Sequence, residues 1–263
     1  MLTLSGPPSR FRKTASPSQI DFEIAALAWL REVPHGVKVA EVLDHGRGWL
    51  TEIRLHSFPP SFSQAEEFGR RLAQTHAAGA PWLGAPPTGY RGKGWIGQAP
   101  LPLVSEASAT SSWGEFYSQS RLRPYLEVFD ADDRALVERL CDRLETGVLD
   151  HPQPALVQQP AARTHGDLWG GNVMWTDGGA VLIDPAASGG HAEDDLGALS
   201  LFGVPHFDRI VAGYQEVSPL APGWEDRLGL HQLHLLTVHA YLFGGAYLTQ
   251  TVDVASRYLP NRQ

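Results

Sequence analysis

The sequence predicts an α+β chain with a small β-rich N-terminal lobe and a larger, mainly helical C-terminal lobe. Residues 9–14, 37–43 and 48–54 have the composition and alternation of short strands and surround a single helical pattern. From Ser63 onward, apolar residues recur mainly at helical spacing. Because the pattern changes near residue 55, we expect one lobe over residues 1–55 and the other over residues 56–263.

The N-terminal lobe contains one clear helix signal after its first strand. Ser18 can cap the first turn, and Ile20, Ile24 and Leu27 recur at the spacing of a core-facing helix surface. Pro34 then ends the pattern, since proline cannot continue a helix. The two remaining strands follow this helix.

In the C-terminal lobe, apolar spacing predicts helices over residues 62–76, 113–129 and 131–144. The intervening residues 81–112 are rich in proline, glycine and serine. They are interpreted either as a long ordered excursion or as a flexible loop.

Composition limits the classes of partner. The chain has 263 residues, of which 43% are hydrophobic and 19% charged, as in globular proteins. Its 21 basic and 29 acidic residues give a net charge of −8, which opposes nucleic-acid binding. The chain has no signal-peptide pattern and no apolar run of about 18 residues that could span a membrane. The lone cysteine, Cys141, agrees with a reducing compartment. We expect a cytoplasmic protein that binds neither nucleic acid nor membrane.

Three polar residues surround a predicted β-hairpin in and after the segment THGDLWGGNVMWTDG, residues 164–178. Asp167 lies on the loop before the hairpin, Asn172 enters its first strand, and Asp184 leaves its second strand. Because both open ends of a hairpin lie at one edge, these three side chains are expected to converge.

The residue types of this trio indicate phosphoryl transfer. Asn172 and Asp184 offer the hard oxygen ligands that Mg²⁺ prefers, and Asp167 can accept a proton from an attacking hydroxyl. Protein-kinase catalytic loops have this spacing: an Asp, an Asn five residues later, and a metal-binding Asp after the next hairpin. The alternative interpretation is a capped turn with surface acids.

The segments HGDLWGGNV, residues 165–173, and DPAASGGHAEDDLGALSLFG, residues 184–203, resemble the fructosamine kinase (ketosamine 3-kinase) family. This family is related to aminoglycoside phosphotransferases and has the protein-kinase-like fold. WIGQAPLPL, residues 95–103, extends a likeness that covers most of residues 11–250. The resemblance implies ATP as co-substrate and a ketosamine, a sugar attached to an amine, as the small-molecule acceptor, phosphorylated on its 3-hydroxyl. It also implies the same catalytic base and the same two magnesium ligands.

The resemblance further implies residues that bind the nucleotide and the acceptor. Kinases of this fold use a strand lysine to bind the α- and β-phosphates and pair it with a helix glutamate. Lys13 and Glu23 match this pair, and the alternative interpretation is that both are ordinary surface charges. The stretch that links the lobes aligns with Glu52 and Ile53, whose backbone is expected to bond the adenine. Trp169 is expected to border the acceptor pocket.

One departure from the family concerns the N-terminus. The family places a strand, a small-residue loop over the ATP phosphates and a second strand before the lysine, whereas only twelve residues precede Lys13. We expect the phosphate-covering loop to be absent from this sequence, through either a mis-assigned start or a real truncation, and residues 5–8, SGPP, to form a turn between strands. Loss of its backbone N–H groups would weaken ATP binding or turnover. Two alternatives therefore stay open: an aminoglycoside-type or other hydroxyl-directed phosphotransferase, and a pseudokinase or binding module.

Other residues near these motifs are expected to serve structure. His165 should support the loop backbone, and Asp195 can cap a helix; the family resemblance implies that it also braces the catalytic loop. Trp113, Phe116 and Tyr117 recur at helical spacing and are expected in the core.

Several histidines could suggest a metal site. His231, His234 and His239 are three and five residues apart, so one helix face cannot present all three, and we interpret them as scaffold. For His191 and Glu193 the two interpretations are that they line the same cleft as the acceptor pocket or that they fix the local turn, and we expect the turn. The sequence leaves the oligomeric state and the particular acceptor open.

Overall fold

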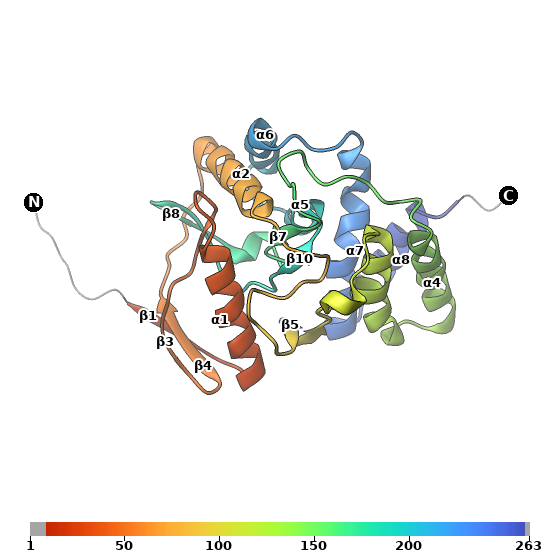
Figure 1. Ribbon diagram of the computed structural model, residues 1–263, viewed down its shortest axis with the longest axis horizontal. Helices are drawn as coiled ribbons and strands as arrows, with labels where there is room; N and C mark the ends of the chain where they lie inside the picture. The colour runs from red at the N-terminus through yellow and green to blue at the C-terminus, as the bar shows by residue number, and fades with distance from the viewer. Residues whose placement is uncertain (1–8, 261–263) are drawn as a thin grey trace, which may run out of the picture.

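The computed structural model describes residues 9–260. In Figure 1, strands β1, β3 and β4 and helix α1 lie at one side, and the long helices α4, α7 and α8 lie at the other. The predicted class is confirmed: a small sheet lobe is followed by a larger, mostly helical lobe. The turn expected at residues 5–8 lies outside the described residues.

The N-terminal sheet is antiparallel, in the order β1-β4-β3. Its strands are β1 (Arg10–Thr14), β3 (Val42–Gly46) and β4 (Trp49–Ile53). Helix α1 (Pro17–Arg31) is capped by Ser16 rather than by the expected Ser18. Ser16 accepts a hydrogen bond from the Gln19 backbone, and the Gln19 side chain accepts one from Ser16, so the two residues form a capping box. Pro17 then occupies the first turn, where its missing N–H has no cost.

The single strand expected over residues 37–43 is wrong, because the structure divides it between two sheets. β2 (Lys38–Val39) pairs in parallel with β9 (Gly179–Leu182), which pairs antiparallel with β8 (Val173–Thr176). The Ala40 N–H donates to the Leu182 carbonyl at 2.8 Å, and the chain then leaves for β3. Alternation of apolar residues cannot show which sheet a strand joins. As a result, the β8–β9 hairpin is hydrogen-bonded directly to the segment that precedes β3.

Helices α2 (Phe62–Ala77) and α6 (Phe207–Val217) pack closely side by side. Glycines allow this approach: a Cβ on Gly69 would lie 1.9 Å from the Ile210 carbonyl oxygen, and one on Gly213 would lie 2.0 Å from that of Glu66. Neither position has room for a side chain unless the helices separate.

The predicted helix over residues 113–129 is broken into three short pieces. They are α3 (Trp113–Tyr117), a π-helical turn (Ser118–Leu122) and a 3₁₀ segment (Arg123–Val128). Pro124 explains the break, since it has no N–H to donate and its ring collides with the preceding turn. Trp113, Phe116 and Tyr117 are buried, which confirms their expected place in the core.

The remaining helices form the body of the larger lobe. They are α4 (Ala131–Glu145), α5 (Ala192–Leu201), α7 (Trp224–Phe243) and α8 (Ala246–Arg257). No helix among residues 9–260 is long and apolar enough to cross a bilayer.

Short strands connect these helices to the hairpin. β7 (Ala162–Thr164) pairs antiparallel with β10 (Ser188–Gly190). Within residues 81–112, β5 (Gly94–Ile96) and β6 (Ala99–Leu101) form a hairpin, followed by a 3₁₀ turn at Glu106–Ser108. This stretch is therefore an ordered excursion.

Candidate functional site

Asp167, Asn172 and Asp184 converge at the open end of the β8–β9 hairpin, as their spacing predicts. The Asn172 amide nitrogen donates to the Asp167 backbone carbonyl at 2.8 Å and to its carboxylate at 3.1 Å. All three residues line one cavity of about 240 Å³. Asp184 has a φ of +55°, a left-handed conformation that is uncommon outside glycine. Such strain is typical of functional sites.

The loop that carries Asp167 is fixed by Asp195 of α5. One carboxylate oxygen of Asp195 accepts hydrogen bonds from the His165 N–H at 2.7 Å and from His76 Nε2 at 3.0 Å. The other oxygen accepts from the Gly166 N–H at 2.9 Å. Gly166 has a φ of +82°, and a Cβ there would lie 2.2 Å from the Ala186 carbonyl oxygen. The expected brace is therefore present, and the loop requires glycine at this position.

His165 also supports the loop, as expected. Its ring is buried, and its Nε2 lies 3.0 Å from the Ile183 carbonyl oxygen at the end of β9. Burial lowers the pKa of His165, so the ring is favoured in its neutral form.

The environment of Asp167 suits a proton acceptor. Burial raises the pKa of Asp167 to about 7, and the charges of Asp184 and Asp195 act in the same direction. The hydrogen bond from Asn172 opposes this rise. A carboxylate with a pKa near neutrality can both take and return a proton.

Lys13 lies at the centre of a group of acids. Its ammonium is 2.7 Å from Glu23 of α1 and 3.2 Å from Glu52 of β4, and it also contacts Asp184. The side chains of Lys13 and Glu23 are only 17% and 18% exposed, so they are not two independent surface charges. Burial lowers the pKa of Lys13, but the three carboxylates outweigh burial and raise it. The lysine therefore stays charged.

A second cavity of about 240 Å³ lies on the other side of Lys13 and Asp184. Its wall is largely apolar and includes Ile53. Glu52 also lines it, and its carboxylate faces Lys13, a contact that the sequence did not predict. The Glu52 backbone lies in the middle strand of the sheet, opposite Phe11 of β1. The hydrogen bonds expected from the Glu52 and Ile53 backbones to adenine remain a prediction.

The cavity that contains Asp167 has a wall that sequence reasoning missed. Trp95 of β5 and Phe22 of α1 line it, together with Gln19, whose side chain donates to the Gly97 carbonyl at 3.0 Å. The motif WIGQAPLPL supported the family resemblance without placing its tryptophan at the site. Trp169 lies outside this lining; the residue is 38% exposed, and its ring stands edge-on to that of Phe202.

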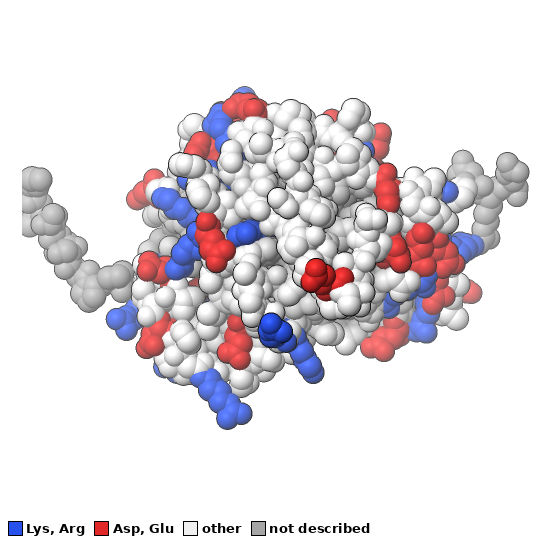
Figure 2. Space-filling view, in the orientation of Figure 1, with Lys and Arg blue, Asp and Glu red and all other residues white. Residues whose placement is uncertain are grey.

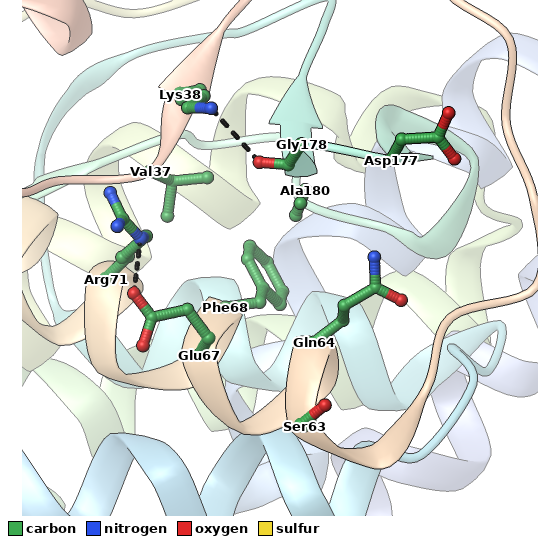
Figure 3. A pocket seen from close by; sticks show the side chains of 11 residues that line it. Val37, Lys38, Ser63, Gln64, Glu67, Phe68, Arg71, Asp177, Gly178 and Ala180 are labelled. Carbon is green, nitrogen blue, oxygen red and sulfur yellow. Dashed lines mark hydrogen bonds and ion pairs between the residues drawn. The ribbon is translucent and has the colours of Figure 1, made fainter.

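A third pocket lies at the closed tip of the same hairpin (Figure 3). There Lys38 donates to the Gly178 carbonyl at 3.0 Å, and Arg71 pairs with Glu67 at 2.6 Å. Both cations are already engaged, and none of the predicted site residues lines this pocket.

The donor set at the open end of the hairpin fits a hard divalent cation. The carboxyl groups of Glu23, Glu52 and Asp184 surround the Lys13 ammonium. The Asp167 carboxyl group lies in the cavity that Glu23 and Asp184 also line. The Asn172 amide nitrogen is used in bonds to Asp167, which leaves its oxygen for a metal. Carboxylate and amide oxygens are the ligands that Mg²⁺ takes in phosphoryl-transfer sites.

Charges are spread over the visible surface. On the face drawn in Figure 2, acidic and basic side chains are scattered in small groups of both signs, and the upper part of the face is largely uncharged. This face has no basic stripe of the kind that binds a phosphate backbone. The net charge of −8 likewise opposes binding to a phosphate backbone.

Comparison with known proteins supports the resemblance seen in the sequence. A family model described as fructosamine kinase matches residues 21–261. An Enterococcus faecium protein assigned as a ketoamine kinase is 34% identical over 204 residues, which cover 76% of this chain and 69% of that protein. A Thermobifida fusca crystal structure, assigned to fructosamine-3-kinase, is 39% identical with a TM-score of 0.83, covering 95% of this chain and 85% of the other.

A more distant structure shows the fold alone. An aminoglycoside phosphotransferase, in a ternary complex with ADP and hygromycin B, superposes with a TM-score of 0.60 at 14% identity, over 98% of this chain and 89% of that one. The two-lobe, protein-kinase-like architecture expected from the sequence is confirmed.

Proposed function

Because this chain belongs to the fructosamine kinase family, whose members are ATP-dependent kinases that phosphorylate a sugar hydroxyl, we propose that it phosphorylates the 3-hydroxyl of a ketosamine. The observation that carries the proposal is the shared cavity of Asp167, Asn172 and Asp184 beside the Lys13–Glu23 ion pair. An acid with a raised pKa, a set of hard oxygen ligands and an aimed ammonium are the parts that phosphoryl transfer needs.

In this proposal Asp167 accepts the proton of the sugar hydroxyl as that oxygen attacks the γ-phosphate. Its position is fixed from two directions, since Asn172 binds its carboxylate and Asp195 binds the two N–H groups just before it. Holding the base in place lowers the entropic cost of reaching the reactive geometry.

Lys13 would bind the α- and β-phosphates, and the ion pair with Glu23 would hold the Lys13 ammonium in position for them. The apolar pocket at Ile53 would accept the adenine. Asn172 and Asp184 would hold Mg²⁺. Its positive charge would offset the negative charge of the phosphates in a site that is already rich in carboxyl groups.

Three further assignments belong to the same proposal. Trp169, partly exposed beside the catalytic loop, would border the sugar. The boundary between the lobes would lie near residue 55, in the connection between β4 and α2. The lone cysteine, Cys141, supports a reducing compartment such as the cytoplasm.

The test is an ADP-release assay with a fructosamine or a ribulosamine and Mg·ATP. Replacing the base by Asp167→Asn should lower kcat by about 10²- to 10⁴-fold, the usual contribution of a general base. Asp142→Asn, on the exposed face of α4, is the matched control and should leave kcat unchanged. Turnover that survives Asp167→Asn would rule out this base.

Two comparisons separate the alternatives. An aminoglycoside panel that is turned over faster than the ketosamines would reassign the acceptor, since fold alone does not fix the substrate. A thermal unfolding midpoint that Mg·ATP does not raise, in a protein without turnover, would indicate a pseudokinase or a module that binds another ligand.

A further inference from the structure

A cluster of four potential metal ligands lies in the larger lobe, formed by residues other than those of the proposed kinase site. His151 precedes β7, His191 and Glu193 begin α5, and His231 lies on α7. One donor atom from each of the four lies within 4.8 Å of the others, and the side chains are buried or nearly so. We call this set the histidine cluster. The helical spacing considered in the sequence could not reveal it, because only His231 comes from that helix.

Two imidazoles of the cluster have the orientation typical of metal ligands. His151 Nδ1 lies 2.8 Å from the Leu149 carbonyl oxygen, and His231 Nδ1 lies 2.6 Å from an Asp194 carboxylate oxygen. Metal-binding histidines usually donate their second ring N–H to such a carbonyl or carboxylate. The two Nε2 atoms then face each other at 2.9 Å. Two neutral rings held in this way direct both lone pairs at one point.

The distances among the donor atoms fit a tetrahedral ion. A Glu193 carboxylate oxygen lies 3.3 Å from His231 Nε2 and 3.7 Å from His151 Nε2. Bonds of about 2.0–2.1 Å at tetrahedral angles separate ligand atoms by about 3.3 Å. The three observed separations, 2.9, 3.3 and 3.7 Å, lie on both sides of that value. Each of these three donors needs to move by only a few tenths of an ångström, whereas the four donors that include His191 lie within 4.8 Å of one another.

We propose that the histidine cluster binds a divalent transition-metal ion such as Zn²⁺ through His151, His231 and Glu193, with His191 as the fourth ligand. His191 is held only by two long hydrogen bonds, 3.2 Å from the Glu193 N–H and 3.3 Å to the Pro152 carbonyl. Giving up one of them would free a ring nitrogen. Two or three imidazoles with one carboxylate are a donor set that suits Zn²⁺.

The ion would have a structural role. It would join the segment after α4, the start of α5 and the middle of α7, under the ring of Trp113, which lies 4.8 Å from both His151 and His231. A buried site with four protein ligands leaves no open position for substrate. α5 also carries Asp195, so the ion would stabilise the helix that braces the catalytic loop.

A metal-free arrangement competes with this one. Arg227 binds both oxygens of Glu193, at 2.9 and 2.7 Å, and an imidazolium at His231 would lie between Glu193 and Asp194. Arg227 and that imidazolium would balance the two carboxylates. In that case the proton takes the place of the metal ion, and added Zn²⁺ would have no effect.

The test uses the full chain, treated with a chelator and dialysed, and titrated with ZnCl₂ by calorimetry and thermal unfolding. One equivalent should bind and raise the unfolding midpoint, and Co²⁺ in its place should show the intense visible absorption of tetrahedral coordination. Asp194→Asn, which replaces the carboxylate partner of His231 with a neutral amide, should weaken Zn²⁺ binding by about 10- to 100-fold. His151→Gln should weaken it further. His239→Gln is the matched control, since His239 lies on α7 with His231 but hydrogen-bonds only to the Leu235 carbonyl. The Zn²⁺ affinity of this variant should equal that of the parent chain.

Two results would overturn the proposal. The first is the absence of both a Zn²⁺-dependent rise in the midpoint and a tetrahedral Co²⁺ spectrum in the parent chain, which needs no variant to fold. The second is binding that His151→Gln and Asp194→Asn leave unchanged, as expected for adventitious binding to surface histidines. Neither result bears on kinase activity, which is measured separately.

Discussion

The brace formed by Asp195 allows one quantitative prediction that connects the fold to the proposed site. In Asp195→Asn, the new side chain has nearly the same shape but only one oxygen. That oxygen can keep the bonds to His165 and His76, and the amide then points its own N–H groups at the Gly166 N–H. Two buried donors are left without partners.

The cost follows from those two donors. An unsatisfied buried polar group costs about 1–3 kcal/mol, so the variant should lose about 2–6 kcal/mol of unfolding free energy. That is a large share of the total of about 5–15 kcal/mol that is typical of natural proteins. The loop before Asp167 would also lose a fixed point, so we expect kcat to fall as well.

Urea unfolding followed by fluorescence measures this loss, with Asp142→Asn as the control. Asp142 is 71% exposed in its pair with Arg123, and such exposed pairs contribute about 1 kcal/mol or less. A loss in Asp195→Asn no larger than in this control would refute the brace.

Acid provides a second check of the same residue. Burial raises the pKa of Asp195, but hydrogen bonds and nearby imidazoles outweigh burial and hold it below its usual range. An acid whose pKa is lower in the folded chain than in the unfolded chain, where it is about 3.9, stabilises the fold at pH values above 3.9. This stabilisation is lost as the pH falls from there through the folded pKa. The difference in unfolding free energy between the parent chain and Asp195→Asn should therefore become smaller below about pH 3.9.

Three further predictions concern other parts of the chain. Gly69→Ala should lower stability by at least about 1–3 kcal/mol in urea unfolding, because its Cβ would lie 1.9 Å from the Ile210 carbonyl oxygen, and a loss equal to that of Gly178→Ala at the hairpin tip would contradict this packing. Glu23→Gln should lower kcat/KM for ATP by about 10-fold or more, since a charge-assisted hydrogen bond contributes about 1.5–3 kcal/mol, and an unchanged value would remove Glu23 from the site. Burial raises the pKa of Cys141 to about 11, so iodoacetamide at pH 8 should label it only in urea, and rapid labelling of the folded chain would show that the core opens.

The site could be predicted from the sequence where a short segment contains the whole constraint. Asn172 and Asp184 flank one hairpin, Asp167 lies on the short loop just before it, and a hairpin brings its own ends together whatever surrounds it. The Lys13–Glu23 pair came from the family resemblance, and the structure forms it at 2.7 Å. Pro124 could in principle have been recognised as a helix break, because its effect is local.

Long-range pairing decided the features that the sequence could not show. Lys38 and Val39 leave the N-terminal sheet to pair with β9, Glu52 turns its carboxylate to Lys13, and Trp95 reaches the cavity from a distant hairpin. The histidine cluster likewise joins His151 to His231 across 80 positions. Residue type and local spacing determine which groups can do chemistry. Which of those groups meet depends on how separate helices and sheets pack, and that packing is a property of the whole folded chain.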